Sequence, residues 1–186
     1  MITARAKVGI DKLFPRCLEE SLRSEAHPSW RMQSVDAKSI NAKSFIMLTI
    51  SSYDFRLIVL LHFTSDNASM QHVAGSLKIS SDALTVSQYE DYLSEVGNII
   101  CGAIKRGLFQ FFPHLGMSSP NQLSCESLKY VESYSIDHAI HIKAKAEDGT
   151  EFYSSLYVSS FGELDFDPVA LSKVEEKVEM GALELF

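Results

Sequence analysis

The sequence has few cysteines and no long apolar run, and each shortage excludes a class of protein. Its three cysteines, Cys17, Cys101 and Cys125, form no closely spaced Cys or Cys/His set of the kind that binds zinc. We therefore expect buried thiols in a reducing compartment and no metal site. The longest aliphatic run, LIVLL at 57–61, is far shorter than the roughly 20 residues that cross a bilayer. The N-terminal stretch MITARAKVGIDKLF lacks the apolar segment of a signal peptide, so we expect a soluble cytoplasmic protein with no membrane partner.

Positive charge is also scarce and scattered. The 186 residues include 17 Lys and Arg against 24 Asp and Glu, and the formal net charge is −7. Because a nucleic-acid surface usually needs a basic stripe, we expect no nucleic-acid partner. The sequence lacks the G-x-S-x-G, Walker and G-x-G-x-x-G motifs of common hydrolase and nucleotide sites. His138 and His141 lie three apart in a predicted strand, where they would project to opposite faces, and this spacing is poor for chelating a metal.

What the sequence does contain is a sharp alternation of helical and strand patterns. Helices are predicted at 11–24, with Pro15 in the first turn, at 65–77, with Ser65 or Asp66 as its cap, and at 86–112. Strands are predicted at 30–39, 43–51, 54–64, 127–136, 139–147 and 151–159, with a loop at 118–124. Asp167 and Pro168 predict the start of a C-terminal helix over about 168–181.

Short polar links join the strands at 43–51 and 54–64, and those at 139–147 and 151–159, so both pairs are predicted to be antiparallel hairpins. The fold class is therefore α+β, an antiparallel sheet with long helices packed on one face. A helix followed by paired strands occurs twice, a pattern that indicates two pseudo-symmetric halves. The length fits a single domain over 1–186, with the C-terminal helix as an appendage.

The helix predicted at 86–112 has two contrasting faces. At ~100° per residue, one side gathers apolar side chains, namely Tyr89, Leu93, Val96, Ile100, Ala103, Ile104 and Phe111. Asp91, Glu95, Asn98 and Gly102 lie on the opposite side. An ordinary solvated face would account for the polar residues. It would not account for Gly102, because a glycine inside a helix costs about 1 kcal/mol relative to Ala. The close approach of another molecule would account for it.

The spacing D-x-x-x-E-x-x-N at Asp91, Glu95 and Asn98, followed by NIICG and by HLGMSSP downstream, resembles the signature of the CheC, CheX and FliY chemotaxis phosphatases. The resemblance implies hydrolysis of the aspartyl phosphate on a response-regulator receiver domain. In this chain Glu95 would pair with the receiver's active-site lysine, and Asn98 would orient the attacking water. Asp91 and Gly102 would belong to the docking surface. The chain would bind no cofactor itself, because the receiver holds the Mg²⁺.

The chain departs from the two-motif members of this family, because it carries a single motif as CheX does. If the N-terminal helix is the pseudo-symmetric partner, Asp11 could match Asp91, and Pro15 and Leu18 would stand in the Glu and Asn places. The resemblance also makes a homodimer plausible. Two alternatives stay open: a non-catalytic binding or dimerisation module that docks a signalling partner, and a structural domain of unrelated function.

Overall fold

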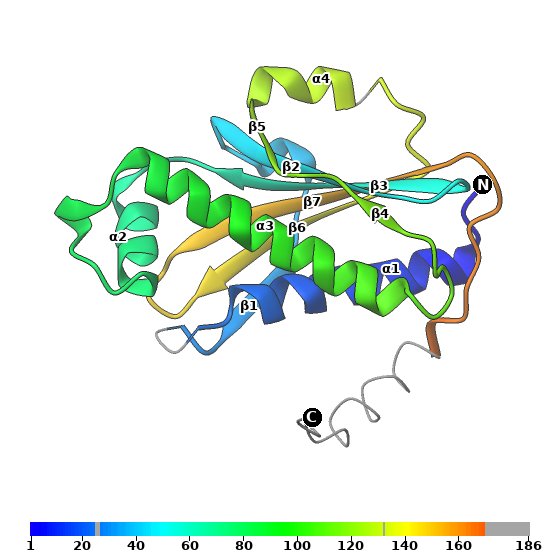
Figure 1. Cartoon of the computed structure of the whole chain (residues 1–186), viewed down its shortest axis with the longest axis horizontal. Helices are drawn as coiled ribbons and strands as arrows, with labels where there is room; N and C mark the ends of the chain where they lie inside the picture. The colour runs from blue at the N-terminus through cyan, green and yellow to red at the C-terminus, as the bar shows by residue number, and fades with distance from the viewer. Residues whose placement is uncertain (25–26, 132, 170–186) are drawn as a thin grey trace.

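The computed structural model describes residues 1–24, 27–131 and 133–169, and its centre is a seven-stranded antiparallel sheet (Figure 1). The strand order is β1-β6-β7-β3-β2-β4, and β5 also pairs with β2. The strands are β1 (Trp30–Ser34), β2 (Ser44–Ser51), β3 (Phe55–Phe63), β4 (Gly116–Met117), β5 (Asn121–Ser124), β6 (His138–Ala146) and β7 (Glu151–Ser160). The predicted α+β class and both predicted hairpins are confirmed.

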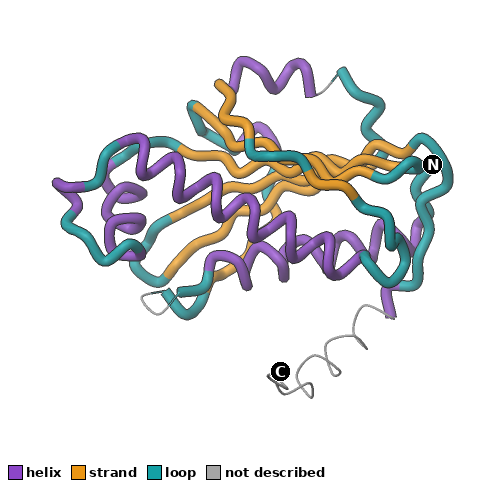
Figure 2. The backbone as a smooth tube through the Cα atoms, viewed as in Figure 1, coloured by secondary structure: helices purple, strands orange, loops and turns teal. Residues whose placement is uncertain are grey.

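The two long helices, α1 (Ala4–Leu22) and α3 (Val86–Leu108), lie against the same face of the sheet, as Figure 2 shows. The main core fills the space between them and the strands. β3 lies between β7 and β2, and its residues are almost all buried because both of its faces are covered. Leu57, Val59 and Leu61 point to the helices, whereas Ile58 and Leu60 belong to a smaller cluster on the opposite face.

One element predicted from the sequence, which lies on this opposite face, differs in the structure. A 3-10 turn at Cys125–Ser127 leads into the segment at 127–136, which was predicted as a strand but contains the short helix α4 (Leu128–Val131). The Ser124 side chain accepts a hydrogen bond from the Glu126 amide and so starts the turn. Leu128 and Val131, three apart, then pack on the second cluster, so a helical spacing outweighs the strand-forming composition of the segment. The predicted loop at 118–124 is wrong at its end, where β5 pairs with β2.

The helix α1 begins earlier than predicted, at Ala4, where the Thr3 side chain accepts a hydrogen bond from the Ala6 amide. Pro15 therefore lies in the interior of the helix and not in its first turn. An interior proline costs about 3 kcal/mol or more. The buried face of α1 offsets that cost, because it places eight residues in the core, namely Ala6, Gly9, Ile10, Leu13, Phe14, Cys17, Leu18 and Leu22.

The remaining helices agree with the sequence in type. The second, α2 (Asn67–Ser76), is capped by Asp66, whose carboxylate accepts from the Ser69 amide at 2.9 Å. Asp167 accepts from the Val169 amide, as an N-cap does, but the rest of the predicted C-terminal helix lies outside the described residues. Within the described part of the chain, no helix has the length and apolar character needed to span a membrane.

Candidate functional site

The candidate site is the outward face of α3, and the helix is fixed firmly at its N-terminus. Thr85 and Gln88 form a reciprocal capping box: the Gln88 amide donates to Thr85 Oγ1 at 3.2 Å, and the Thr85 amide donates to Gln88 Oε1 at 3.0 Å. The inward face is buried through Tyr89, Leu93, Val96, Ile100, Ile104 and Leu108. The helix ends at Leu108, a turn earlier than predicted. A capped helix with one buried face holds its outward side chains at defined positions.

Gly97 and Gly102, two of the three glycines of α3, serve different surfaces. Gly97 is buried against β2, and a Cβ built on it would lie 2.7 Å from Leu48 Cδ1. This glycine therefore allows the helix to approach the sheet closely. A Cβ on Gly102 would meet only Arg106 Nη1, at 3.4 Å. The absence of a side chain at Gly102 is therefore not required by packing within the described residues.

Glu95 and Asn98 lie one turn apart on this outward face and contact each other. Asn98 Nδ2 donates to Glu95 Oε2 at 3.4 Å, close to the long limit for a hydrogen bond. Glu95 is exposed and Asn98 is partly exposed, so both can reach a molecule docked on the helix. Asp91 is exposed one turn before Glu95. The structure thus brings together all four residues that the sequence indicates, in the order Asp91, Glu95, Asn98, Gly102 along the helix.

The sequence analysis did not single out the apolar side chain beside this pair. Ile99 is 43% exposed and lies about 40° from Glu95 around the helix axis, so it belongs to the same outward face. An exposed isoleucine next to a carboxylate and an amide offers apolar contact to a docking partner. The sequence could have identified Ile99, because the helical repeat places this isoleucine on the polar side of the helix and outside the apolar stripe.

The stretch after α3 lies beside the helix on β2. β4 pairs with Ile50 and Ser51, and β5 pairs with the other half of β2. Gln122 Nε2 of β5 donates to Glu90 Oε1 of α3 at 2.6 Å. The stretch HLGMSSP is therefore held next to the helix that carries the motif.

The helix α1 does not carry a counterpart of the Glu95–Asn98 pair at the positions that align with it. Leu18 is completely buried, so the alignment that put it at the outward Asn position is wrong at that residue. Asp11 is exposed, and its carboxylate contacts His138 Nε2 at 2.6 Å. His138 and His141 project to opposite faces as predicted, since His141 Nδ1 contacts Ser155 Oγ at 2.8 Å on the other side of the sheet.

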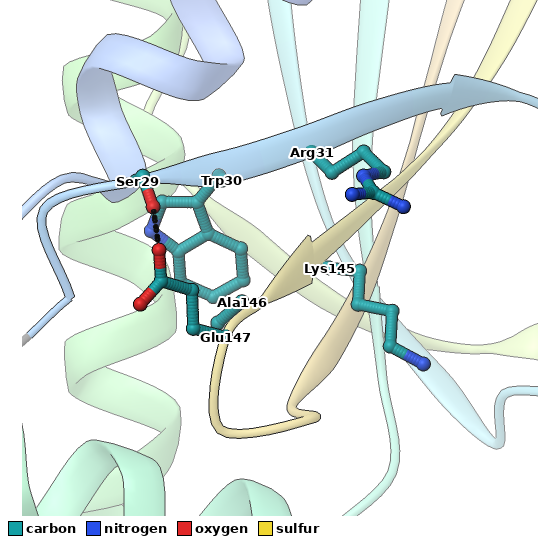
Figure 3. A pocket seen from close by; sticks show the side chains of 6 residues that line it. All are labelled: Ser29, Trp30, Arg31, Lys145, Ala146 and Glu147. Carbon is teal, nitrogen blue, oxygen red and sulfur yellow. Dashed lines mark hydrogen bonds between the residues drawn. The ribbon is translucent and has the colours of Figure 1, made fainter.

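The surface pocket shown in Figure 3 lies away from this site. It has a volume of about 530 Å³ and is lined by Ser29, Trp30, Arg31, Lys145, Ala146 and Glu147 at the β1–β6 edge. The helix α3 packs over β2 and β3, near the other edge of the sheet. The outward face of α3 is the surface of a helix, a shape suited to a macromolecular partner.

Comparisons with known proteins identify the fold. No family model and no curated protein matches the sequence. Among solved structures, CheX from Vibrio vulnificus is similar with a TM-score of 0.62 and 14% identity, covering 84% of this chain and 99% of that one. A CheC-like superfamily protein from Shewanella sp. PV-4 is similar with a TM-score of 0.61 and 11% identity, covering 82% of this chain and 99% of that one. A chain from the CheX-CheY-BeF3-Mg²⁺ complex of Borrelia burgdorferi is similar with a TM-score of 0.59 and 18% identity, covering 82% of this chain and 97% of that one. The predicted CheC/CheX fold is confirmed.

Proposed function

We propose that this chain, which has the CheC/CheX fold, hydrolyses the aspartyl phosphate of a response-regulator receiver domain. The observation that carries the proposal is the Glu95–Asn98 pair, exposed one turn apart on a helix that is capped and packed on the sheet. The similar CheX chain crystallised in a complex with CheY supports a receiver as the partner. The formal charge of −7 fits a protein partner better than an anionic polymer.

The residue types suit phosphoryl transfer. This chemistry depends mainly on positioning and on stabilising charge, and the receiver supplies the Mg²⁺. The Asn98 amide can accept a hydrogen bond from a water molecule and donate one to it, which fixes the line of attack on phosphorus. An ionised carboxylate at that position could not donate and would repel the phosphoryl group.

The other three residues form the docking surface around Asn98. The Glu95 carboxylate is the natural partner for an ammonium group, such as a lysine in the receiver's active site. In the free protein Glu95 also accepts a long hydrogen bond from Asn98, so the two side chains already lie side by side before a receiver docks. Asp91 extends the acidic surface by one turn. Gly102 leaves room on the side of Asn98 toward the C-terminal end of the helix.

The test is the rate of phosphate loss from receiver domains of the same organism, phosphorylated with a small phosphodonor in the presence of Mg²⁺. We expect this protein to accelerate the loss from at least one receiver. If no receiver responds but one binds, the chain is a docking module and the proposed reaction is wrong. Binding is measured separately by calorimetry, so the two outcomes are distinct.

Gly97 and Gly102 of α3 give a matched pair of alanine variants. Gly102→Ala should stabilise the free protein by up to about 1 kcal/mol, because Ala is the better helix former and only a flexible guanidinium lies near. The same methyl group stands on the docking surface, so dephosphorylation should slow roughly 10- to 100-fold. Gly97→Ala should instead destabilise the fold by ~1 kcal/mol or more, because its methyl group overlaps Leu48. Urea unfolding and the receiver assay separate the two effects. Unchanged activity in Gly102→Ala would remove this glycine from the docking surface.

A further inference from the structure

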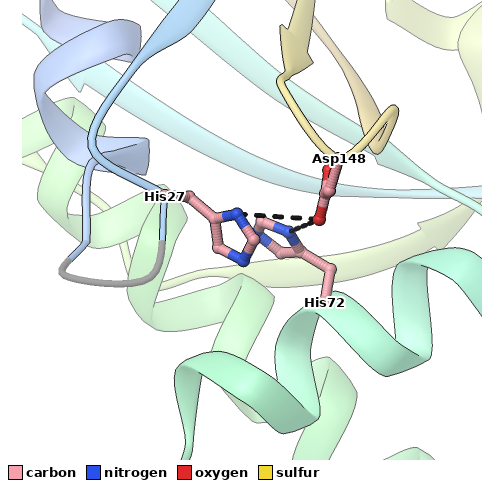
Figure 4. A group of neighbouring side chains, drawn as sticks. All are labelled: His27, His72 and Asp148. Carbon is pink, nitrogen blue, oxygen red and sulfur yellow. Dashed lines mark hydrogen bonds and ion pairs between the residues drawn. The ribbon is translucent and has the colours of Figure 1, made fainter.

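Three metal-ligating side chains from distant parts of the sequence meet at one end of the sheet (Figure 4). His27 precedes β1, His72 belongs to α2, and Asp148 lies in the turn between β6 and β7. Their ligating atoms all lie within 4.8 Å of one another. Both imidazoles direct Nδ1 at the same carboxylate oxygen, Asp148 Oδ2, from 3.6 Å for His27 and 3.5 Å for His72. We propose that His27, His72 and Asp148 bind a divalent transition-metal ion of the zinc class.

The distances favour a shared ion over direct hydrogen bonds. An N–H···O bond joins its heavy atoms at about 2.7–3.2 Å, and a contact of 3.5–3.6 Å is at or beyond the limit. Zinc binds imidazole nitrogen and carboxylate oxygen at about 2.0–2.2 Å, and at a tetrahedral angle this places N and O about 3.3–3.5 Å apart. The observed separations of 3.5 and 3.6 Å lie at and just beyond the upper end of that range.

The carboxylate and the His72 ring are already held in place. The Thr150 amide donates to Asp148 Oδ1 at 2.8 Å, which leaves Oδ2 directed at the imidazoles. Gly149, at φ +92°, provides the tight turn that this contact needs. The His72 ring is packed edge-on against Trp30 and Phe152, with centroids 5.2 and 5.6 Å away. Contacts of this kind around the ligands fix their geometry before the ion arrives.

A purely electrostatic cluster explains the arrangement less well. The two imidazoles are stacked with centroids 3.9 Å apart, so protonating both would place two positive charges in contact beside a single carboxylate. Burial, with the nearby His27 as a second cause, lowers the pKa of His72. Neutral imidazoles are the form that coordinates metals.

The site is open on one side. His27 and Asp148 line a surface pocket together with Pro28, Ser29 and Glu147. Ser29 Oγ donates to Glu147 Oε1 at 2.8 Å across its rim, so the segment before β1 and the β6–β7 turn are joined there (Figure 3). Three protein ligands and an open side leave the fourth position of a tetrahedral ion to water. A bound ion would tie this segment, α2 and the turn together.

The test is a titration of the metal-free 186-residue chain with Co²⁺ and Zn²⁺. We expect one ion per chain, displacement of Co²⁺ by Zn²⁺, and a cobalt spectrum of four-coordinate type. Because the donors are nitrogen and oxygen, no thiolate-to-cobalt charge-transfer band should appear. Binding should weaken as the pH falls, because protons compete with the ion for its ligand atoms.

Variants decide whether these residues are the ligands. Asp148→Asn and His27→Gln should each weaken binding by more than about tenfold, since even residues behind the ligands contribute that much. The matched control is His114→Gln, at an exposed histidine after α3, which should bind as the wild type does. Absence of stoichiometric binding, or equal affinity in the wild type, Asp148→Asn and His27→Gln, would overturn the proposal. Receiver dephosphorylation does not enter this test, so its result is independent of the proposed function.

Discussion

Replacing Asn98 by alanine should reduce receiver dephosphorylation at least about 100-fold and leave the fold intact. The loss follows from the role of the amide, because a water molecule that is no longer held in line with phosphorus loses most of the benefit of positioning. The fold should persist because Asn98 is partly exposed, its side chain contacts Glu95 only through a long 3.4 Å hydrogen bond, and Ala is a better helix former than Asn. The measurements are the rate of phosphate loss at saturating receiver and the urea midpoint.

Three companion variants separate chemistry from docking. Asn98→Asp is nearly isosteric and should be as inactive as Asn98→Ala, because an ionised carboxylate cannot donate to the water. Glu95→Ala should raise the half-saturating receiver concentration, since the carboxylate acts through the partner's ammonium group. Glu126→Ala is the matched control, an exposed glutamate beside α4 on the opposite side of the sheet. A fully active Asn98→Ala with normal receiver binding would rule out the catalytic role.

The sequence predicts the site well where a single helix carries all of its parts. The apolar stripe from Tyr89 to Ile104 fixes which way α3 faces, and once that is known the outward place of Glu95 and Asn98 follows from the helical repeat. The purpose of Gly97 could not be deduced in this way. Its need for space depends on Leu48, which lies in a strand that the sequence does not place against the helix.

The errors arise where tertiary contacts outweigh local preference. Pro15 looked like a helix start, yet buried residues on both sides of it carry α1 through the proline. The Tyr- and Val-containing segment at 127–136 favoured a strand, but a serine cap and the second apolar cluster make it helical at Leu128–Val131. The group of His27, His72 and Asp148 has no sequence signature, because His72 and Asp148 are 76 positions apart and only the sheet topology brings them together. The expectation of no metal site rested on the spacing of the cysteines and on His138 and His141, and the proposed metal titration tests it.

Acid should destabilise the fold through a histidine on the other face of the sheet. His62 is 2% exposed, its Nε2 contacts Ser155 Oγ at 2.9 Å, and its Nδ1 has no hydrogen-bond partner among the residues that the structure describes. His141 contacts the same hydroxyl, which can donate to one ring and accept from the other only while the acceptor ring is neutral. Burial, with His141 as a second cause, lowers the pKa of His62 to about 4 from its ordinary value of 6.5.

The direction of this pH effect follows from which state of the chain, folded or unfolded, binds the proton more tightly. The unfolded chain takes up the proton near pH 6.5, whereas the folded protein resists it until about pH 4. The stability contributed by the neutral ring is therefore complete above pH 6.5 and is lost as the pH falls from there to about 4. At about 1.4 kcal/mol per pKa unit, the loss from this residue approaches about 3 kcal/mol at pH 4.

His62→Gln isolates this contribution, because glutamine keeps a polar group near Ser155 and does not titrate. The urea-derived free energy of unfolding should fall less between pH 7 and pH 4 in the variant than in the wild type, by about 2–3 kcal/mol. Protonation of carboxylates and of His72 and His141 continues in both proteins, so only the difference between them reports His62. His114→Gln, at an exposed position, should retain the full wild-type dependence. Parallel pH profiles for the wild type and His62→Gln would mean that the buried ring is protonated in the folded state as readily as in the unfolded chain.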